Sequence, residues 1–142
     1  MNRLLHRLLY RLLPLRAYLL TVSRLYFLTL ALGRGRHTRA LEYAYHLPRL
    51  LRPGDTAIDI GANLGYYTRP MSRIVGPEGR VYAVEPVPVI CEVLRRNLRG
   101  RDNVRILNCA LGDGDRPVEM AKDSVAAAGY FGTGRNFVDD GR

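Results

Sequence analysis

The sequence predicts an α/β domain that is built on a parallel sheet and preceded by basic amphipathic helices. From residue 56 onward, short β-branched runs alternate with segments of helical spacing, and glycine-containing turns separate them. Such alternation produces right-handed βαβ units with parallel strands. Leucines and arginines on opposite helical faces over residues 1–32 predict the helices. The length of 142 residues allows one domain, and the 47% hydrophobic content is that of a globular chain.

Positive charge is concentrated in the N-terminal third of the chain. The formal net charge is +9, and residues 1–52 contain ten arginines and one acid, so residues 53–142 carry no net charge. This split disfavours a uniformly basic domain that binds nucleic acid. We therefore rank nucleic acid last among the partners considered.

The cysteines and histidines predict no metal site. Cys91 and Cys109 have no neighbouring cysteine or histidine at the short paired spacing that a structural zinc site requires. Two isolated thiols fit a reducing compartment. We therefore expect a cytoplasmic location. If the N-terminal helices bind a membrane, we expect the protein to lie peripherally on its surface.

The N-terminal helices have three possible roles. Six leucines at positions 4, 5, 8, 9, 12 and 13 share one helical side, opposite the arginines at 3, 7 and 11, and Pro14 is expected to end or kink this helix. A second apolar run covers residues 17–32 and contains Arg24. Residues 1–32 would lie in a membrane interface, pack on the domain or a partner, or act as a spanning or signal segment. We favour the first and expect residues 1–39 to form an extension with a basic linker, separate from a domain at 40–142.

Each remaining element has its own signal. Helical spacing predicts helices at 40–51, 66–75 and 88–98, and apolar β-branched runs predict strands at 56–60, 80–85 and 103–108. After residue 113, small and polar residues dominate, so we expect a hairpin fragment at 117–120 followed by a mostly irregular tail.

Two chemical features meet at the carboxyl edge of this predicted sheet, where ligands of such folds bind. The turn Asp59-x-Gly61-x-x-x-Gly65 follows the first strand, and Glu85 closes the second. Glycines allow the backbone to approach a ligand closely, and a carboxylate can accept both hydroxyls of a ribose. Asn63 occupies the position of the second glycine in a dinucleotide fingerprint, and no P-loop lysine follows. The pattern favours an S-adenosylmethionine site over one for a nicotinamide cofactor, ATP or GTP.

Three segments resemble the FkbM family of S-adenosylmethionine-dependent methyltransferases: DIGANLGYYT at 59–68, VYAVEPVP at 81–88 and NVRILNCALGD at 103–113. The resemblance implies a Rossmann-like class I methyltransferase fold and O-methylation of a sugar, glycan or small natural product. It also implies cofactor contacts in three groups. These are Asp59, Gly61, Ala62, Asn63, Gly65 and Tyr66 toward the methionine and ribose, Glu85 and Pro86 at the ribose hydroxyls, and Asn108 and Ala110 beside the adenine.

The chain departs from the FkbM pattern in two respects. Pro70 stands in a helix where the family has an aliphatic residue, so a kink is expected. The family continues past the third strand into an acidic motif that is missing here, so we expect a partial, truncated domain whose first strand has an unpaired edge prone to self-association. The alternative function is therefore a catalytically inactive cofactor-binding fragment, associated with a membrane through residues 1–32.

No catalytic residue can be identified from the sequence. The candidates for a general base are acids and a histidine that no motif singles out, namely His46, Asp113, Asp115, Asp139 and Asp140. Each is better explained as a solvated surface group.

Overall fold

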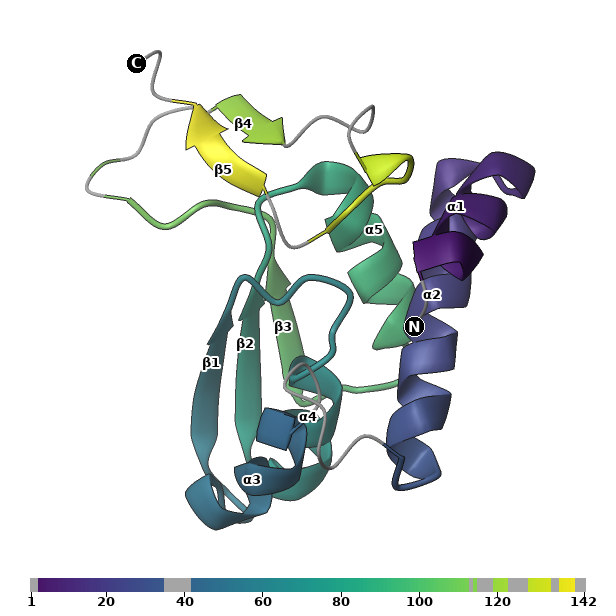
Figure 1. The fold of residues 1–142 in the computed structure, drawn as a ribbon. Helices are drawn as coiled ribbons and strands as arrows, with labels where there is room; N and C mark the ends of the chain where they lie inside the picture. The colour runs from purple at the N-terminus through teal and green to yellow at the C-terminus, as the bar shows by residue number, and fades with distance from the viewer. Residues whose placement is uncertain are drawn as a thin grey trace.

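A computed structural model describes residues 3–34, 42–112, 114, 119–122, 128–133 and 136–139 (Figure 1). The helices are α1 Arg3–Leu12, α2 Leu15–Ala31, α3 Glu42–Leu50, α4 Thr68–Val75 and α5 Pro88–Asn97. The strands are β1 Thr56–Ile60, β2 Arg80–Val84, β3 Val104–Leu107, β4 Glu119–Lys122 and β5 Asn136–Asp139.

The parallel sheet has the predicted order and direction. β1 pairs with β2 and β2 pairs with β3, all parallel, in the order β1-β2-β3. The register places Ile60 beside Val84 and Val84 beside Leu107, so the three strands end at one common edge. This is the first part of a Rossmann-like methyltransferase fold, as predicted from the sequence. The turns after β1 and β2 therefore lie next to each other.

The helices cover one face of the sheet (Figure 1). α4 contacts β1 and β2, and Leu94 and Leu98 of α5 form a buried cluster with Ala83 of β2 and Ala62 of the first turn. The side chains of β1 alternate, so that those of Ala57 and Asp59 point to this face and are buried. One part of the core thus lies between the sheet and the α4–α5 layer, and a second buried cluster lies between α5 and α2.

The other face of the sheet leaves large apolar side chains in contact with solvent. Ile58 is 62% exposed and Ile60 is 68% exposed, and both belong to β1, which is the edge strand of the three-stranded sheet. An apolar edge strand favours pairing with another chain. Self-association through this edge stays a prediction.

We expect the chain to form concentration-dependent oligomers through β1. Replacing Ile58 by lysine places a charge on the exposed side of the edge strand and should shift the equilibrium toward monomer. Sedimentation velocity over a range of concentrations measures this shift. A wild-type chain that stays monomeric at all concentrations contradicts the expectation.

The N-terminal helices separate at Pro14 as predicted, because the proline backbone cannot continue α1. Tyr18, Leu19 and Val22 of α2 are buried against Leu64 and α5. This packing fits the role of a helical extension on the domain for α2. No helix in the described part of the chain is long and apolar enough to cross a membrane. The boundary at residue 39 stays a prediction.

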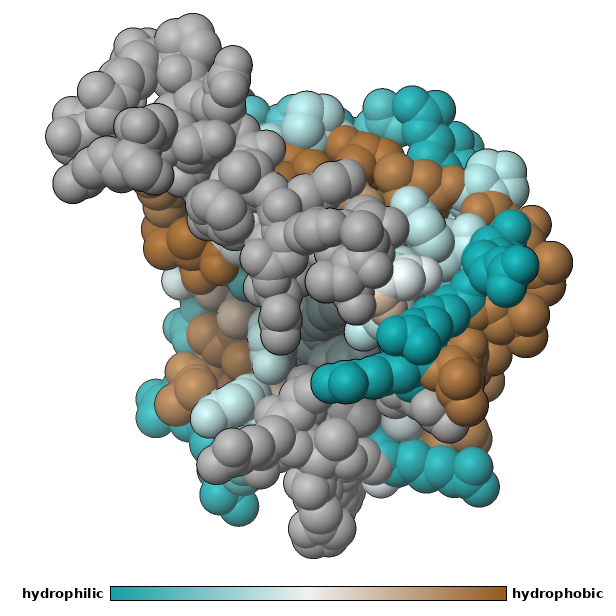
Figure 2. Space-filling model, turned by 45° about the horizontal axis from the view of Figure 1, so that its top comes forward, coloured by the Kyte–Doolittle hydropathy of each residue, from teal (hydrophilic) through white to brown (hydrophobic). Residues whose placement is uncertain are grey.

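α1 differs from α2 in having no buried residue. Leu4, Leu8 and Leu12 are all more than half exposed. Figure 2 shows hydrophobic side chains along the right margin of the molecule, the side on which α1 and α2 lie in Figure 1. Leu9, in contrast, is half-buried and packs against the buried cluster of α2, so only part of the apolar side of α1 is exposed.

Two sequence expectations concern local structure. Pro70 lies in the first turn of α4, where a backbone N–H has no intrahelical partner, so it breaks no hydrogen bond of this helix. The C-terminal region is more regular than expected, because β4 and β5 form an antiparallel pair. The expected hairpin at 117–120 lies partly outside the described residues, as does most of the basic linker at 33–39.

Candidate cofactor site

Asp59 connects the end of β1 to the start of α4. Its side chain is 7% exposed, and the Thr68 hydroxyl donates a 2.6 Å hydrogen bond to Oδ2. Burial raises the pKa of Asp59, and the hydrogen bonds from Thr68 partly oppose this. The hydrogen bond from Thr68 supports a role for Asp59 in holding the turn. Thr68 ends the segment DIGANLGYYT at 59–68, and the motif did not predict a role for its hydroxyl.

The turn after β1 has the conformation that its sequence requires. Gly61, Asn63 and Gly65 all have positive φ, of 75°, 53° and 89°, which is readily adopted by glycine and tolerated by asparagine. The N–H groups of Gly61 and Ala62 both donate to the carbonyl of Val84, each at 2.9 Å. The turn is therefore fixed to the end of β2.

Glu85 is the central acidic group of the site. Its carboxylate is buried, and each oxygen accepts one backbone hydrogen bond of 2.9 Å: Oε2 from the N–H of Asn63 and Oε1 from the N–H of Val87. Burial raises the pKa of Glu85, the two N–H groups oppose this, and the nearby Asp59 adds to it. One carboxylate thus bridges the turns that follow β1 and β2.

These residues fit an adenosyl cofactor. Each oxygen of Glu85 has a second lone-pair direction that is available to a ribose hydroxyl. Oδ1 of Asn63, next to this carboxylate, is buried and accepts no hydrogen bond from the described residues, although its Nδ2 donates to the carbonyl of Thr133. A buried acceptor without a donor is costly, and a hydroxyl of a bound ligand would satisfy it. Figure 2 looks toward this edge and shows a hollow near the centre.

Asn108 holds the loop after β2. Its Nδ2 donates to the carbonyls of Glu85 at 2.7 Å and Pro86 at 3.0 Å. The side chain therefore fixes the position of Glu85 relative to the end of β3. Ala110 lies further along the same connection and is half-buried. Contact of Asn108 and Ala110 with adenine stays a prediction.

Three predicted site positions pack against helices. Ala62 belongs to the buried cluster with Leu94, and a Cβ on Gly65 would lie 3.0 Å from Cδ1 of the same leucine. The ring of Tyr66 lies 4.0 Å from that of Tyr26 on α2. Burial raises the pKa of the Tyr66 hydroxyl. In this structure these three residues pack the turn against α5 and α2.

A C-terminal segment that the sequence analysis had not singled out reaches the site. Phe131 is buried in the α2–α5 cluster, its carbonyl accepts from the Tyr18 hydroxyl, and the ring of Tyr130 stacks on His6. These contacts place the carbonyl of Thr133 beside Asn63. The aromatic pair within a glycine-rich tail was the one signal in the sequence that could have indicated this packing.

Of the candidate bases, His46 is exposed on α3, away from the turns that follow β1 and β2. Asp113, Asp115 and Asp140 lie outside the described residues, and the side chain of Asp139 is not described. In the part of the chain that the structure covers, no group of three or more histidines, cysteines or acids is placed to hold a metal ion.

Gly65 is expected to be more important for stability than Gly61. Both have positive φ, so alanine strains the backbone at either position by about 1–2 kcal/mol. Only at Gly65 does the added Cβ meet neighbouring atoms, those of Leu94 and Leu98. Urea unfolding should therefore show a larger loss of unfolding free energy for Gly65→Ala than for Gly61→Ala. Equal losses would show that contact of the added Cβ with α5 does not lower the unfolding free energy.

The raised pKa of Glu85 predicts opposite pH trends for stability and cofactor affinity. Between its unfolded and folded pKa values the folded chain binds more protons than the unfolded chain, so the contribution of Glu85 to stability falls as pH rises through this interval. Affinity should fall as pH is lowered toward the folded pKa, because a protonated carboxyl is a poorer acceptor. Urea unfolding and calorimetric titration from about pH 4 upward measure both trends. A Glu85→Gln chain with the same pH dependence would assign them to another group.

Comparison with known proteins identifies a family for this chain. The model of the family described as protein-L-isoaspartate(D-aspartate) O-methyltransferase matches residues 29–122, which is more than half of the chain. The chain belongs to this family. The predicted cofactor, S-adenosylmethionine, and membership of a methyltransferase family are thereby confirmed. The FkbM family suggested by the motifs is not the family of the matching model.

Two relatives within the isoaspartate O-methyltransferase family are archaeal. A protein-L-isoaspartate O-methyltransferase of Methanopyrus kandleri is 32% identical over 100 residues, which cover 68% of this chain and 44% of that protein. Another, of Aeropyrum pernix, is 34% identical over 61% of this chain and 34% of that protein. The chain thus spans less than half the length of these relatives.

Among solved structures, Aeropyrum pernix fibrillarin with natively bound S-adenosyl-L-methionine matches 48% of this chain and 31% of that protein. Its sequence is 30% identical and the TM-score is 0.42.

Proposed function

We propose that this chain is the cofactor-binding part of an S-adenosylmethionine-dependent methyltransferase that acts on isoaspartyl carboxylates of proteins. The family description and the names of both archaeal relatives support this acceptor. The observation that carries the proposal is the buried carboxylate of Glu85, which the backbones of Asn63 and Val87 hold at the carboxyl edge of the sheet. No family match supports the earlier expectation of a sugar, glycan or natural-product acceptor.

The chain's own residues would bind and orient the cofactor. Glu85 accepts the ribose hydroxyls, and the turn at 61–65 brings backbone close to the ligand because Gly61 has no side chain to obstruct it. Asn108 keeps the backbone of Glu85 in place through its two hydrogen bonds. When bound, the cofactor supplies a methyl group on a sulfonium. Positioning of this kind is the main requirement of an in-line displacement.

A carboxylate acceptor simplifies the demands on catalytic residues. An aspartyl-type carboxyl has a reference pKa of about 4, so it is ionised at neutral pH and needs no general base. A sugar hydroxyl, in contrast, must lose a proton during transfer. The isoaspartyl acceptor therefore requires no general base at the site.

The proposal is tested by transfer of labelled methyl from S-adenosylmethionine to a peptide that contains one isoaspartyl residue. The control is the same peptide with a normal aspartyl residue. We expect labelling of the first peptide only. No labelling of either peptide by a chain that binds S-adenosylhomocysteine would favour the alternative, a cofactor-binding chain without transferase activity. This alternative is worth testing because the chain covers less than half the length of these two relatives.

Peripheral membrane contact through residues 1–32 remains a second proposal, and cytoplasmic location remains a prediction. The exposed leucines at positions 4, 8 and 12 of α1 support membrane contact. Co-sedimentation with neutral and anionic vesicles tests it, with a triple leucine-to-serine variant at these positions as the control. Equal sedimentation of both chains would contradict it.

A further inference from the structure

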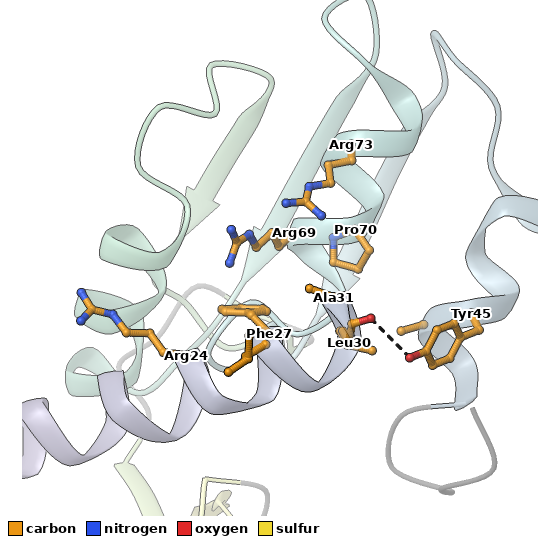
Figure 3. A pocket seen from close by; sticks show the side chains of 10 residues that line it. Arg24, Phe27, Leu30, Ala31, Tyr45, Arg69, Pro70 and Arg73 are labelled. Atoms are coloured by element: carbon orange, nitrogen blue, oxygen red, sulfur yellow. Dashed lines mark hydrogen bonds between the residues drawn. The ribbon is translucent and has the colours of Figure 1, made fainter. Parts of the chain in front are cut away.

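A pocket of about 450 Å³ lies between α2, α3 and α4, outside the site at Glu85 (Figure 3). Its wall contains three arginines, two aromatic rings and small apolar groups. The lining residues are Arg24, Phe27, Leu28, Leu30, Ala31, Ala44, Tyr45, Arg69, Pro70 and Arg73. The pocket shares no residue with the predicted cofactor contacts, so its function is independent of the proposed transferase.

The charge of the pocket is uncompensated within the described residues. None of the lining residues is acidic, and the one ion pair in the described part of the chain joins Arg16 to Glu92 elsewhere. Burial lowers the pKa of Arg69, and the positive charge of Arg73 lowers it further. Guanidinium groups that have no acidic partner among the described residues favour binding of an anion.

One arginine of the pocket is oriented by the wall. The guanidinium carbon of Arg69 lies 4.5 Å from the centre of the Phe27 ring, a cation–π contact that orients this side chain. Figure 3 shows Arg69 and Arg73 adjacent on α4, Arg24 on α2 with its guanidinium pointing away from them, and Tyr45 toward the other end. The Tyr45 hydroxyl donates to the carbonyl of Leu30 at 3.5 Å, which directs this ring to α2.

We propose that this pocket binds a phosphate monoester, with the phosphate at Arg69 and Arg73 and the organic group on the apolar wall near Phe27 and Tyr45. A phosphate monoester carries about −1.5 to −2 charges at neutral pH and three terminal oxygens, which match several guanidinium donors. A carboxylate offers less charge and fewer oxygens. The same chemistry is present in a free phosphorylated metabolite and in the headgroup of phosphatidate.

Titration calorimetry of the full chain with phenyl phosphate tests binding of the free form. Vesicles of phosphatidylcholine with and without phosphatidate test the lipid form. Arg73→Gln removes an exposed pocket guanidinium, and the matched control Arg96→Gln removes an exposed arginine of α5 outside the pocket. We expect saturable binding of at least one probe that Arg73→Gln weakens about tenfold and Arg96→Gln leaves unchanged.

Binding of phenyl phosphate would assign the pocket to a free ligand, and binding only to phosphatidate vesicles would assign it to a lipid headgroup. Each of these results supports the proposal. Absence of saturable binding to either probe overturns it. Equal weakening by Arg73→Gln and Arg96→Gln also overturns it. Such a result would show that the probe is attracted by the overall positive charge of the chain and not by the pocket. Neither outcome depends on methyl transfer.

Discussion

Replacing Glu85 by glutamine is expected to weaken binding of S-adenosylhomocysteine about 10- to 100-fold. Hydrogen bonds to a charged acceptor contribute about 1.5–3 kcal/mol each, and glutamine loses the charge that would hold the ribose hydroxyls. The amide would also direct an N–H₂ group toward the N–H of Asn63 or Val87, which both donate to the present carboxylate. Titration calorimetry of wild type and variant measures the change.

The matched control for this experiment is Glu92→Gln. Glu92 is a partly exposed acid on α5 that pairs with Arg16, away from the turns. Its replacement should leave the affinity unchanged. Similar affinities for the Glu85→Gln and wild-type chains, both folded, would show that Glu85 does not bind the cofactor.

The largest effect on stability is expected for Leu94→Ala. Leu94 is fully buried between α5 and the sheet, where it packs with Ala83 and Leu98. Removing a buried leucine side chain costs about 2–5 kcal/mol in unfolding free energy, and a small core has little stability in reserve. Urea unfolding followed by circular dichroism measures the loss.

Leu12→Ala is the control for this substitution, because Leu12 is 69% exposed on α1. The same chemical change should there alter the unfolding free energy by less than about 0.5 kcal/mol. If the two variants are equally stable, the layer of α5 on the sheet does not form the core.

The sequence predicted the sheet and the meeting of the two turns at its carboxyl edge, because both depend on local signals. Alternating short strands and helices determine a parallel order, and this order places the turn at Gly61 beside Glu85. The position of Pro70 within α4 was not predicted, because the start of a helix cannot be located within two residues from sequence and proline is costly only in helix interiors.

Features that depend on contacts distant in sequence could not be predicted. The packing of Phe131 against α2, and with it the position of Thr133 beside Asn63, joins segments more than 60 residues apart. The family assignment failed for a related reason. The quoted motifs surround a cofactor that many methyltransferases share, so they indicate the cofactor and carry little information about the acceptor.

The central claim is that the edge formed by the turn at 61–65 and Glu85 binds S-adenosylmethionine. Its most direct test is calorimetric titration of the full wild-type chain with S-adenosylhomocysteine, beside a titration with NAD. We predict one saturable site per chain for S-adenosylhomocysteine and none for NAD, since Asn63 replaces the glycine that a pyrophosphate requires. A folded chain that binds neither ligand, or that binds NAD instead, would contradict the claim.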